Sequence, residues 1–236
     1  MDDETRQERN PVHPVILSKT MVRVKICGMT NLDDALHAAR CGADLLGFIF
    51  ADSPRRVAPD QARVIVAALR AEGLVHPITV GVFVNTPPGD VIGLCTDCGL
   101  TAAQLHGDES PDQCRLISRA GISVIKSFRI RDRTSLDALV RYDAADFVLC
   151  DTYDPKQAGG TGRPFDHSLV AGLGNSYRLI LAGGLTPENV AAAVRIVRPW
   201  GVDVSSGVEA APGRKDPAKV EAFLHNAKPS GVGLCP

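Results

Sequence analysis

The sequence has 236 residues, of which 44% are hydrophobic, and its 26 basic and 27 acidic residues leave a formal net charge of −1. That length suits one α/β barrel domain better than two small domains. The balanced charge and an aromatic content of 5% argue against a nucleic-acid partner, and the apolar runs are shorter than the roughly 20 residues needed to cross a membrane.

The two ends of the chain differ from its middle. Residues 1–20 show no sustained periodicity and are predicted to be a disordered extension, while residues 228–236 are predicted to be a flexible tail. Residues 21–227 contain no linker-like stretch and are predicted to form a single domain. The polar, acidic start does not resemble a secretory signal, and seven irregularly spaced cysteines indicate reduced thiols, so a cytoplasmic location is expected.

Short apolar runs alternate with amphipathic segments along this middle part. The expected strands are 22–26, 45–50, 78–84, 102–105, 123–128, 147–150, 178–181 and 202–204. The expected helices are 31–41, 59–71, 88–97, 110–120, 134–142, 166–171, 187–197 and 216–226. Proline and acidic residues open several of these helices, the first at Thr30, and Gly42, Gly73, Gly99 and Gly121 follow four of them as C-terminal caps.

Eight strand–helix units of this kind predict an α/β fold, the (β/α)8 TIM barrel, as a single domain. The main alternative is a doubly wound open sheet. Such a sheet usually carries a G-x-G-x-x-G motif after its first strand, and this sequence has only Cys27-Gly28-Met29 there.

Polar side chains stand at the carboxyl ends of several expected strands. Residues two apart on a strand share a face, so Lys25 points the same way as Cys27, and Gln104 the same way as His106. A single charged residue in such a place is explained by a structural salt bridge, but several at one rim of a barrel favour a functional site. The other members of this polar set are Lys126, Asp151, Asp203 and Ser205.

Cys27 and Asp151 are the most reactive members of the set. A thiol removes a carbon-bound proton when it is held as a thiolate, which requires a pKa below the ordinary value of about 8.5. A carboxylic acid at the end of the sixth strand donates a proton near neutrality only if its pKa is raised. Lys25 could stabilise the thiolate or pair with Asp203, and Cys27 alone is equally well explained as a small buried hydrophobe.

Three glycine-bearing segments suggest a bound phosphate: GGTG at residues 159–162, AGGL at 182–185 and SSGVE at 205–209. The last two follow the seventh and eighth expected strands, the usual place in a barrel for a phosphate held by loop amides. The first is a candidate mobile lid or simply a flexible loop. In the second βα loop, DSPRRV at residues 52–57 offers a guanidinium suited to bidentate binding of a carboxylate.

Cys95 and Cys98 form a C-x-x-C pair, which raises the alternative of a metal-binding or redox protein. The sequence has no second pair and no histidine at zinc spacing nearby. The pair is therefore interpreted as one packed and one near-surface thiol at the end of a helix.

Five segments occur in order: VKICGMT at 24–30, GVFVN at 81–85, QLHG at 104–107, LAGGL at 181–185 and VDVSSGVE at 202–209. Together they resemble the phosphoribosylanthranilate isomerase family of tryptophan biosynthesis, from about residue 22 to residue 226. The resemblance implies a (β/α)8 barrel that catalyses the Amadori rearrangement of N-(5-phosphoribosyl)anthranilate to 1-(2-carboxyphenylamino)-1-deoxyribulose 5-phosphate.

The resemblance also implies roles for individual residues. Asp151 matches the general acid that opens the furanose ring, Cys27 the general base that takes the C2 proton, and Arg56 the arginine that holds the anthranilate carboxylate. The reaction is redox-neutral and implies no cofactor and no metal. The residues expected to bind phosphate are Gly183, Gly184, Ser205, Ser206 and Gly207, and those expected to line the pocket are Asp203, His106 and Lys25.

The sequence departs from the family at His167, where tryptophan is frequent, and at Cys150, where leucine is common. Neither change removes a catalytic group. A related isomerase of the histidine pathway performs the same rearrangement but has an aspartate in the place of Cys27, and a non-catalytic phosphosugar-binding barrel would need neither Cys27 nor Asp151. The expected partner is thus a small phosphosugar, without nucleic acid or membrane, and the protein is expected to be a monomer or a homodimer.

Overall fold

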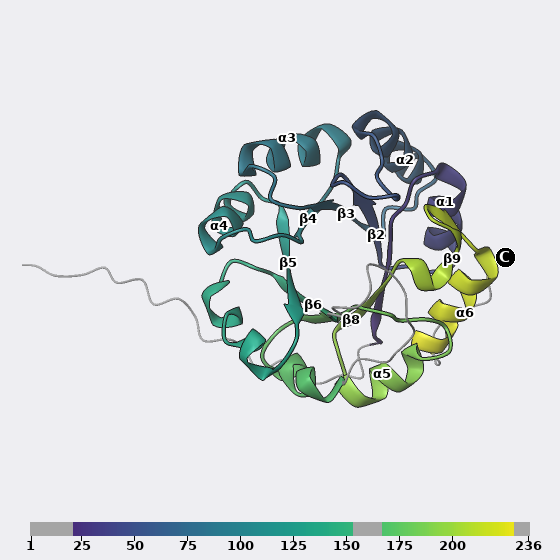
Figure 1. Ribbon diagram of the computed structural model, residues 1–236. Coiled ribbons are helices and arrows are strands. Elements are labelled where there is room, and N and C mark those ends of the chain that lie inside the picture. Colours follow the sequence, from purple (N-terminus) through teal and green to yellow (C-terminus); the bar gives the residue numbers. More distant parts are fainter. Residues whose placement is uncertain (1–20, 153–166, 229–236) are drawn as a thin grey trace, which may run out of the picture.

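The computed structural model is a closed barrel of eight parallel strands with helices around it, viewed down the barrel in Figure 1. The structure describes residues 21–152 and 167–228. Strands follow one another in chain order, and β8 pairs with β1 to close the barrel, which confirms the predicted fold. The strands are β1 (Arg23–Cys27), β2 (Leu45–Ile49), β3 (Ile78–Phe83), β4 (Ala102–Leu105), β5 (Ser123–Ile130), β6 (Phe147–Thr152), β7 (Leu179–Leu181) and β8 (Gly201–Val204).

Three predicted segments fall beyond this part of the chain. The extension at residues 1–20 and the glycine-bearing segment 159–162 lie outside the described residues. The same holds for the predicted tail, apart from its first residue, Lys228.

The α-helices lie outside the barrel strands (Figure 1). Their ends follow from local sequence: at the start of α4, Ser110 and Gln113 form a capping box. The four predicted glycine caps all have positive φ angles, which glycine adopts without a steric penalty. α1 is capped by Asn31 instead of Thr30, because the Asn31 side chain accepts the N–H of Asp34. The α-helices are α1 (Leu32–Arg40), α2 (Pro59–Ala71), α3 (Pro88–Cys98), α4 (Pro111–Arg119), α5 (Val190–Val197) and α6 (Pro217–Ala227).

The alternation of side chains along the strands gives the barrel an apolar interior with a polar upper layer. The interior cluster consists of Leu45, Val80, Ala102, Ile125, Phe147, Leu149, Ile180 and Ala182. The next inward position along β4, β5 and β8 carries Gln104, Ser127 and Asp203, respectively. The interior therefore changes from apolar to polar toward the carboxyl ends of the strands.

The helix predicted over residues 134–142 is instead two short 3₁₀ helices, Arg133–Leu136 and Leu139–Arg141. Asp132 accepts hydrogen bonds from the hydroxyl of Thr134 at 2.7 Å and from the backbone N–H of Ser135 at 3.0 Å. These bonds cap the start of the first 3₁₀ helix. The backbone then bonds over three residues and not four, as from the N–H of Asp137 to the carbonyl of Thr134, so no α-helix develops.

Two later helices are also shorter than predicted. The segment 166–171 contains the 3₁₀ helix His167–Val170, and the helix predicted over 187–197 begins at Val190. The Asn189 side chain accepts the N–H of Thr186 and donates to the carbonyl of Gly184. This bracing keeps the preceding residues in a turn.

A short antiparallel hairpin after β8 has no counterpart among the predicted elements. It consists of β9 (Glu209–Ala211) and β10 (Arg214–Lys215). Strands of three and two residues are too short to show a two-residue periodicity in sequence.

Lys126 does not join the polar set inside the barrel, so its predicted place in that set is wrong. It alternates with the inward-facing Ile125 and therefore faces the helix layer. There its ammonium lies 3.0 Å from a carboxylate oxygen of the buried Glu109 and donates to the carbonyl oxygens of Leu105 and Gly107. Lys126 thus belongs to a structural ion pair that braces the loop between β4 and α4.

One cysteine departs from the predicted reduced state. Cys41, which follows α1, is disulfide-bonded. Of the other described cysteines, Cys27, Cys95, Cys98, Cys114 and Cys150 are free.

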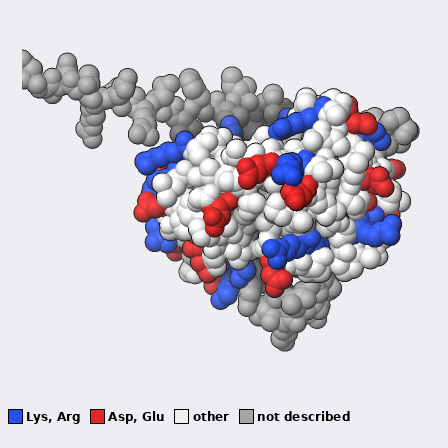
Figure 2. All heavy atoms as spheres, turned by 90° about the horizontal axis from the view of Figure 1, so that it is seen from above, with Lys and Arg blue, Asp and Glu red and all other residues white. Residues whose placement is uncertain are grey.

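On the face drawn in Figure 2, acidic and basic side chains are intermingled and do not gather by sign. Within residues 21–152 and 167–228, no helix has the length and apolar character required to span a membrane.

Candidate functional site

The carboxyl ends of the barrel strands hold most of the predicted site residues. Cys27 is the last residue of β1 and is buried, and Asp203 lies in β8. His106 directly follows β4. β6 extends further than predicted, so Asp151 lies within that strand and not after it. Because all eight strands are parallel, these ends meet at one mouth of the barrel.

Asp151 is connected to the barrel interior through His106 and Gln104. Nε2 of His106 lies 3.4 Å from Oδ2 of Asp151, and Nδ1 lies 2.9 Å from Nε2 of Gln104. When the Gln104 amide donates to Nδ1, the proton of a neutral imidazole is on Nε2 and faces the Asp151 carboxylate. The Asp151 side chain is 31% exposed, so a ligand can reach the carboxyl group that His106 contacts.

Lys25 forms an ion pair with Asp203 beside Cys27. Its side chain is fully buried, and its Nζ lies 2.9 Å from Oδ1 of Asp203. Burial alone would lower the pKa of Lys25, but the charges of Asp203 and Cys27 raise it above its usual value. For Cys27, burial raises the pKa of the thiol, while the charge of Lys25 opposes that change.

The loop after β2 carries two arginines in different surroundings. Arg55 binds the carboxylate of Glu209 with both ends of its guanidinium, at 2.8 Å through Nε and 2.7 Å through Nη2. Lys215 lies 3.0 Å from the same carboxylate. Arg56 is exposed, and a bridge to Ile49 holds its backbone next to the end of β2. The two neighbours are therefore a half-buried arginine that anchors the loop and an exposed guanidinium at the mouth.

Glu209 is charged because of these partners. Burial alone would raise its pKa, but the hydrogen bonds from Arg55 and the charge of Lys215 lower it. Hydrogen bonding to Glu209 also raises the pKa of Arg55. The buried cluster thus ties the loop after β2 to the β9–β10 hairpin.

The predicted phosphate-binding residues lie in the loops after β7 and β8. Gly183 and Gly184 have φ angles of +92° and +62°, a region that favours glycine. A Cβ atom on Gly207 would lie 2.0 Å from the carbonyl oxygen of Leu185, so the two loops touch where Gly207 has no side chain. Gly207 is therefore needed for this close packing, while Gly183 and Gly184 are needed for the backbone conformation of their loop.

Within the described residues, three buried side-chain oxygens have no hydrogen-bond partner: Oε1 of Gln104, Oγ of Ser127 and Oγ of Ser205. Gln104 and Ser127 lie at inward-facing positions of the barrel, and Ser205 directly follows β8. Buried polar atoms in proteins nearly always have a partner. These three oxygens are suited to bind polar groups of a ligand.

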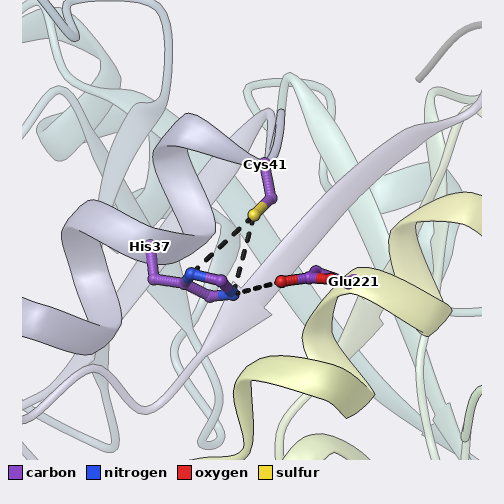
Figure 3. A group of neighbouring side chains, drawn as sticks. All are labelled: His37, Cys41 and Glu221. Carbon is purple, nitrogen blue, oxygen red and sulfur yellow. Dashed lines mark hydrogen bonds and ion pairs between the residues drawn. The ribbon is translucent and has the colours of Figure 1, made fainter. Parts of the chain in front are cut away.

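A second cluster of polar residues lies outside the barrel, between α1 and α6 (Figure 3). Nε2 of His37 lies 3.4 Å from Oε1 of Glu221 and 3.6 Å from the sulfur of Cys41. These are metal-binding residue types, but the disulfide removes the thiolate that Cys41 would need as a ligand. We therefore assign this cluster a structural role in joining the two helices.

The C-x-x-C pair has the properties of packed thiols. Cys95 and Cys98 are both buried, and burial raises the pKa of Cys95 to about 12. The Cys98 thiol donates to the carbonyl oxygen of Pro59. A thiol that is neutral and buried is a poor nucleophile and a poor metal ligand.

Three charged residues of the mouth were not among the predicted site residues: Arg55, Glu209 and Lys215. Glu209 ends the SSGVE motif, which directly follows an expected apolar strand. This position is a signal from which its burial could have been predicted. Its pairing with Arg55, 154 residues away, leaves no pattern in a single sequence.

Comparison with known proteins agrees with this geometry. The family model for N-(5'-phosphoribosyl)anthranilate (PRA) isomerase matches residues 24–226. The N-(5'-phosphoribosyl)anthranilate isomerase of Geobacter sulfurreducens is 52% identical over 211 residues, which cover 88% of this chain and 99% of the relative.

Solved structures give the same result. The chain matches the phosphoribosyl anthranilate isomerase of Thermotoga maritima with a TM-score of 0.81 and 42% identity, over 88% of this chain and 98% of that one. A phosphoribosyl anthranilate isomerase in complex with reduced 1-(o-carboxyphenylamino)-1-deoxyribulose 5-phosphate matches with a TM-score of 0.78 and 41% identity, over the same shares. The resemblance in the five sequence segments is confirmed: the chain belongs to the N-(5'-phosphoribosyl)anthranilate isomerase family.

Proposed function

We propose that this protein catalyses the Amadori rearrangement of N-(5-phosphoribosyl)anthranilate in tryptophan biosynthesis. The observation that carries the proposal is the meeting of a thiol and a carboxyl group at one barrel mouth, in a chain of this family. Cys27 ends β1 and Asp151 stands near the end of β6. A base and an acid on different strands can serve the two proton transfers of this reaction.

In the first step Asp151 acts as general acid. It protonates the ring oxygen of the furanose, the C1–O bond breaks, and the nitrogen lone pair forms the C1=N bond of a protonated Schiff base. His106 and Gln104 orient the carboxyl group through the contacts at 3.4 Å and 2.9 Å. This orientation keeps the acid directed toward the substrate.

In the second step Cys27 acts as general base. Its thiolate takes the proton from C2, and the electrons of the C2–H bond form the C1=C2 bond of an enolamine while the nitrogen becomes neutral. The enolamine then tautomerises to the ketone. The product is an isomer of the substrate, so the bond changes within the sugar together with these proton transfers require neither a redox cofactor nor a metal.

The two ends of the substrate are anionic, and the mouth offers a group for each. The exposed guanidinium of Arg56 is suited to the anthranilate carboxylate. The loops with Gly183, Gly184, Ser205, Ser206 and Gly207 are suited to the phosphate. We further propose that the protein acts in the cytoplasm, as a monomer or a homodimer; one solved relative is described as a dimeric enzyme from which monomers were generated.

The direct test is conversion of phosphoribosylanthranilate by the purified full chain, followed as loss of anthranilate-type fluorescence. We expect turnover without any added metal or cofactor. Binding of the substrate with no conversion would contradict the isomerase function and support a phosphosugar-binding barrel. Conversion of the aminated ribose of the histidine pathway alone would support the related isomerase.

Replacing Arg56 by methionine is expected to raise KM by about 10- to 100-fold with a smaller change in kcat. A hydrogen-bonded charge pair with the substrate contributes roughly 1.5–3 kcal/mol, and this interaction exists before and during the reaction. Steady-state kinetics measure both parameters. Arg63→Met, on the exposed side of α2, is the matched control and should leave KM unchanged. An unchanged KM in Arg56→Met would show that the carboxylate is held elsewhere.

A further inference from the structure

Lys25 is a buried cation that the two proton transfers leave without a role. It lies on β1 two residues before Cys27, so the two side chains point to the same side of the strand. Its side chain is fully buried, which is rare for lysine and requires compensation. Asp203 supplies one partner, at 2.9 Å.

The position of Gly47 shows how close Lys25 and Cys27 are to each other. A Cβ atom on Gly47 would lie 2.8 Å from the sulfur of Cys27 and 3.0 Å from Nζ of Lys25. The ammonium and the sulfur therefore border one small space, which β2 leaves open by having no side chain there. The backbone carbonyl of Gly47 also accepts the N–H groups of Gly28 and Met29, which fixes the turn directly after Cys27.

The other cations near Cys27 form ion pairs with a different residue. Arg55 and Lys215 both bind Glu209, and Lys215 also donates to the carbonyl of Ser205. Asp203 is an anion and disfavours a second negative charge on the sulfur. Among the charged groups that act on Cys27 in the described residues, Lys25 is the cation with the largest effect in favour of the thiolate.

The charges of Lys25, Cys27 and Asp203 affect one another's pKa values. Burial raises the pKa of Cys27, and the charge of Lys25 opposes that rise. Lys25 itself stays protonated, because Asp203 and Cys27 raise its pKa against the effect of burial. Without Lys25, Cys27 would face the effects of burial and Asp203 with only the more distant help of Lys215 and Arg55.

We propose that Lys25 is a positioning residue for proton abstraction: Asp203 keeps its ammonium charged and in place, and the ammonium stabilises Cys27 as the thiolate. The proton removed from C2 then passes to the sulfur, which becomes a thiol. This last point rests on the proposed function, whereas the coupling between Lys25 and Cys27 is a property of the protein without substrate.

The test measures the acidity of Cys27 directly. The full chain, as wild type and as Lys25→Met, is alkylated with iodoacetamide across a pH series without substrate, and the rate at Cys27 is read by mass spectrometry of its peptide. Methionine keeps the length of the side chain and removes the charge. We expect the pH midpoint of Cys27 alkylation to rise by about one unit or more, a loss of about tenfold in rate below the midpoint.

Further variants separate an electrostatic role from a structural one. Lys126→Met removes a second buried lysine, which pairs with Glu109 away from Cys27, and should leave the Cys27 midpoint unchanged. Lys25→Met/Asp203→Asn removes the ion pair as a whole, so no buried carboxylate is left unpaired, and its midpoint should lie above that of Asp203→Asn alone. If Lys25→Met fails to fold, this comparison decides the question.

An unchanged Cys27 midpoint in folded Lys25→Met, or equal midpoints in Lys25→Met/Asp203→Asn and Asp203→Asn, would overturn the proposal. In an active enzyme, the acidic limb of kcat/KM should move by the same amount as the alkylation midpoint in Lys25→Met, with partial rescue by Lys25→Arg. If wild-type protein converts no phosphoribosylanthranilate but the midpoints move as expected, the proposed function fails and the coupling of Lys25 to Cys27 stands.

Discussion

Replacing Asp151 by asparagine is expected to lower kcat by about 10³-fold, within the roughly 10²–10⁴-fold contribution of general acid–base catalysis. The amide has nearly the same shape as the carboxyl group and keeps its contact with His106, but it cannot give a proton to the furanose oxygen. KM should change little, because the phosphate and carboxylate groups of the substrate bind elsewhere. Steady-state fluorescence kinetics on the purified variant measure both parameters.

The matched control for this variant is Asp143→Asn. Asp143 pairs with Arg115 of α4 at 2.9 Å, and it precedes β6, so it lies at the amino ends of the strands, opposite the mouth. Its replacement should leave kcat unchanged. A kcat in Asp151→Asn within a few-fold of the wild type would show that another group opens the ring.

Replacing Cys27 by serine is expected to cost a similar factor, about 10²–10⁴-fold in kcat. A hydroxyl group is far less acidic than a thiol and does not form the anion that removes the C2 proton. Stopped-flow fluorescence should still show binding of the substrate. Cys98→Ser is the matched control, because Cys98 ends α3, outside the barrel strands, and the serine hydroxyl can keep the donation to the carbonyl of Pro59.

The pH dependence gives a second measure of Cys27. Burial raises the pKa of its thiol, so the base is formed only as the pH increases. Wild-type kcat/KM is therefore expected to rise with pH through the neutral and mildly alkaline range, and Cys27→Ser should lack this rise. Equal activity of the wild type and Cys27→Ser at every pH would exclude Cys27 as the base.

The sequence was sufficient to predict the barrel because each strand–helix unit repeats a local pattern. The signals for each unit are local: apolar runs of suitable length, prolines in first turns, and glycines such as Gly42 and Gly99. Each determines the backbone structure within a few residues of its own position. The prediction failed where the backbone bonds over three residues and not four, as in the segment after Asp132 that forms two 3₁₀ helices. Lys126 was misplaced because only the register of β5 decides which side it faces.

The site could be predicted only in part, for a physical reason. Cys27, Asp151 and Asp203 stand at strand ends, and parallel strands bring those ends together whatever the details of packing. The space beside Gly47 and the bond between Arg55 and Glu209 depend on three-dimensional contacts between distant segments. A glycine in an apolar strand has no sequence pattern that reveals which atoms approach it.

The closure of the barrel has a consequence for protein synthesis. β1 is synthesised before β8, the strand with which it pairs. Lys25 therefore has no carboxylate partner until Asp203, 178 residues later, has been added to the chain. Arg55 likewise remains without its carboxylate until Glu209 has left the ribosome. A nascent chain can hold both Cys27 and Asp151 and still lack the surroundings that make them useful. Isomerase activity is therefore expected to appear in one late step of folding, when residues 201–215 dock against the first two strands.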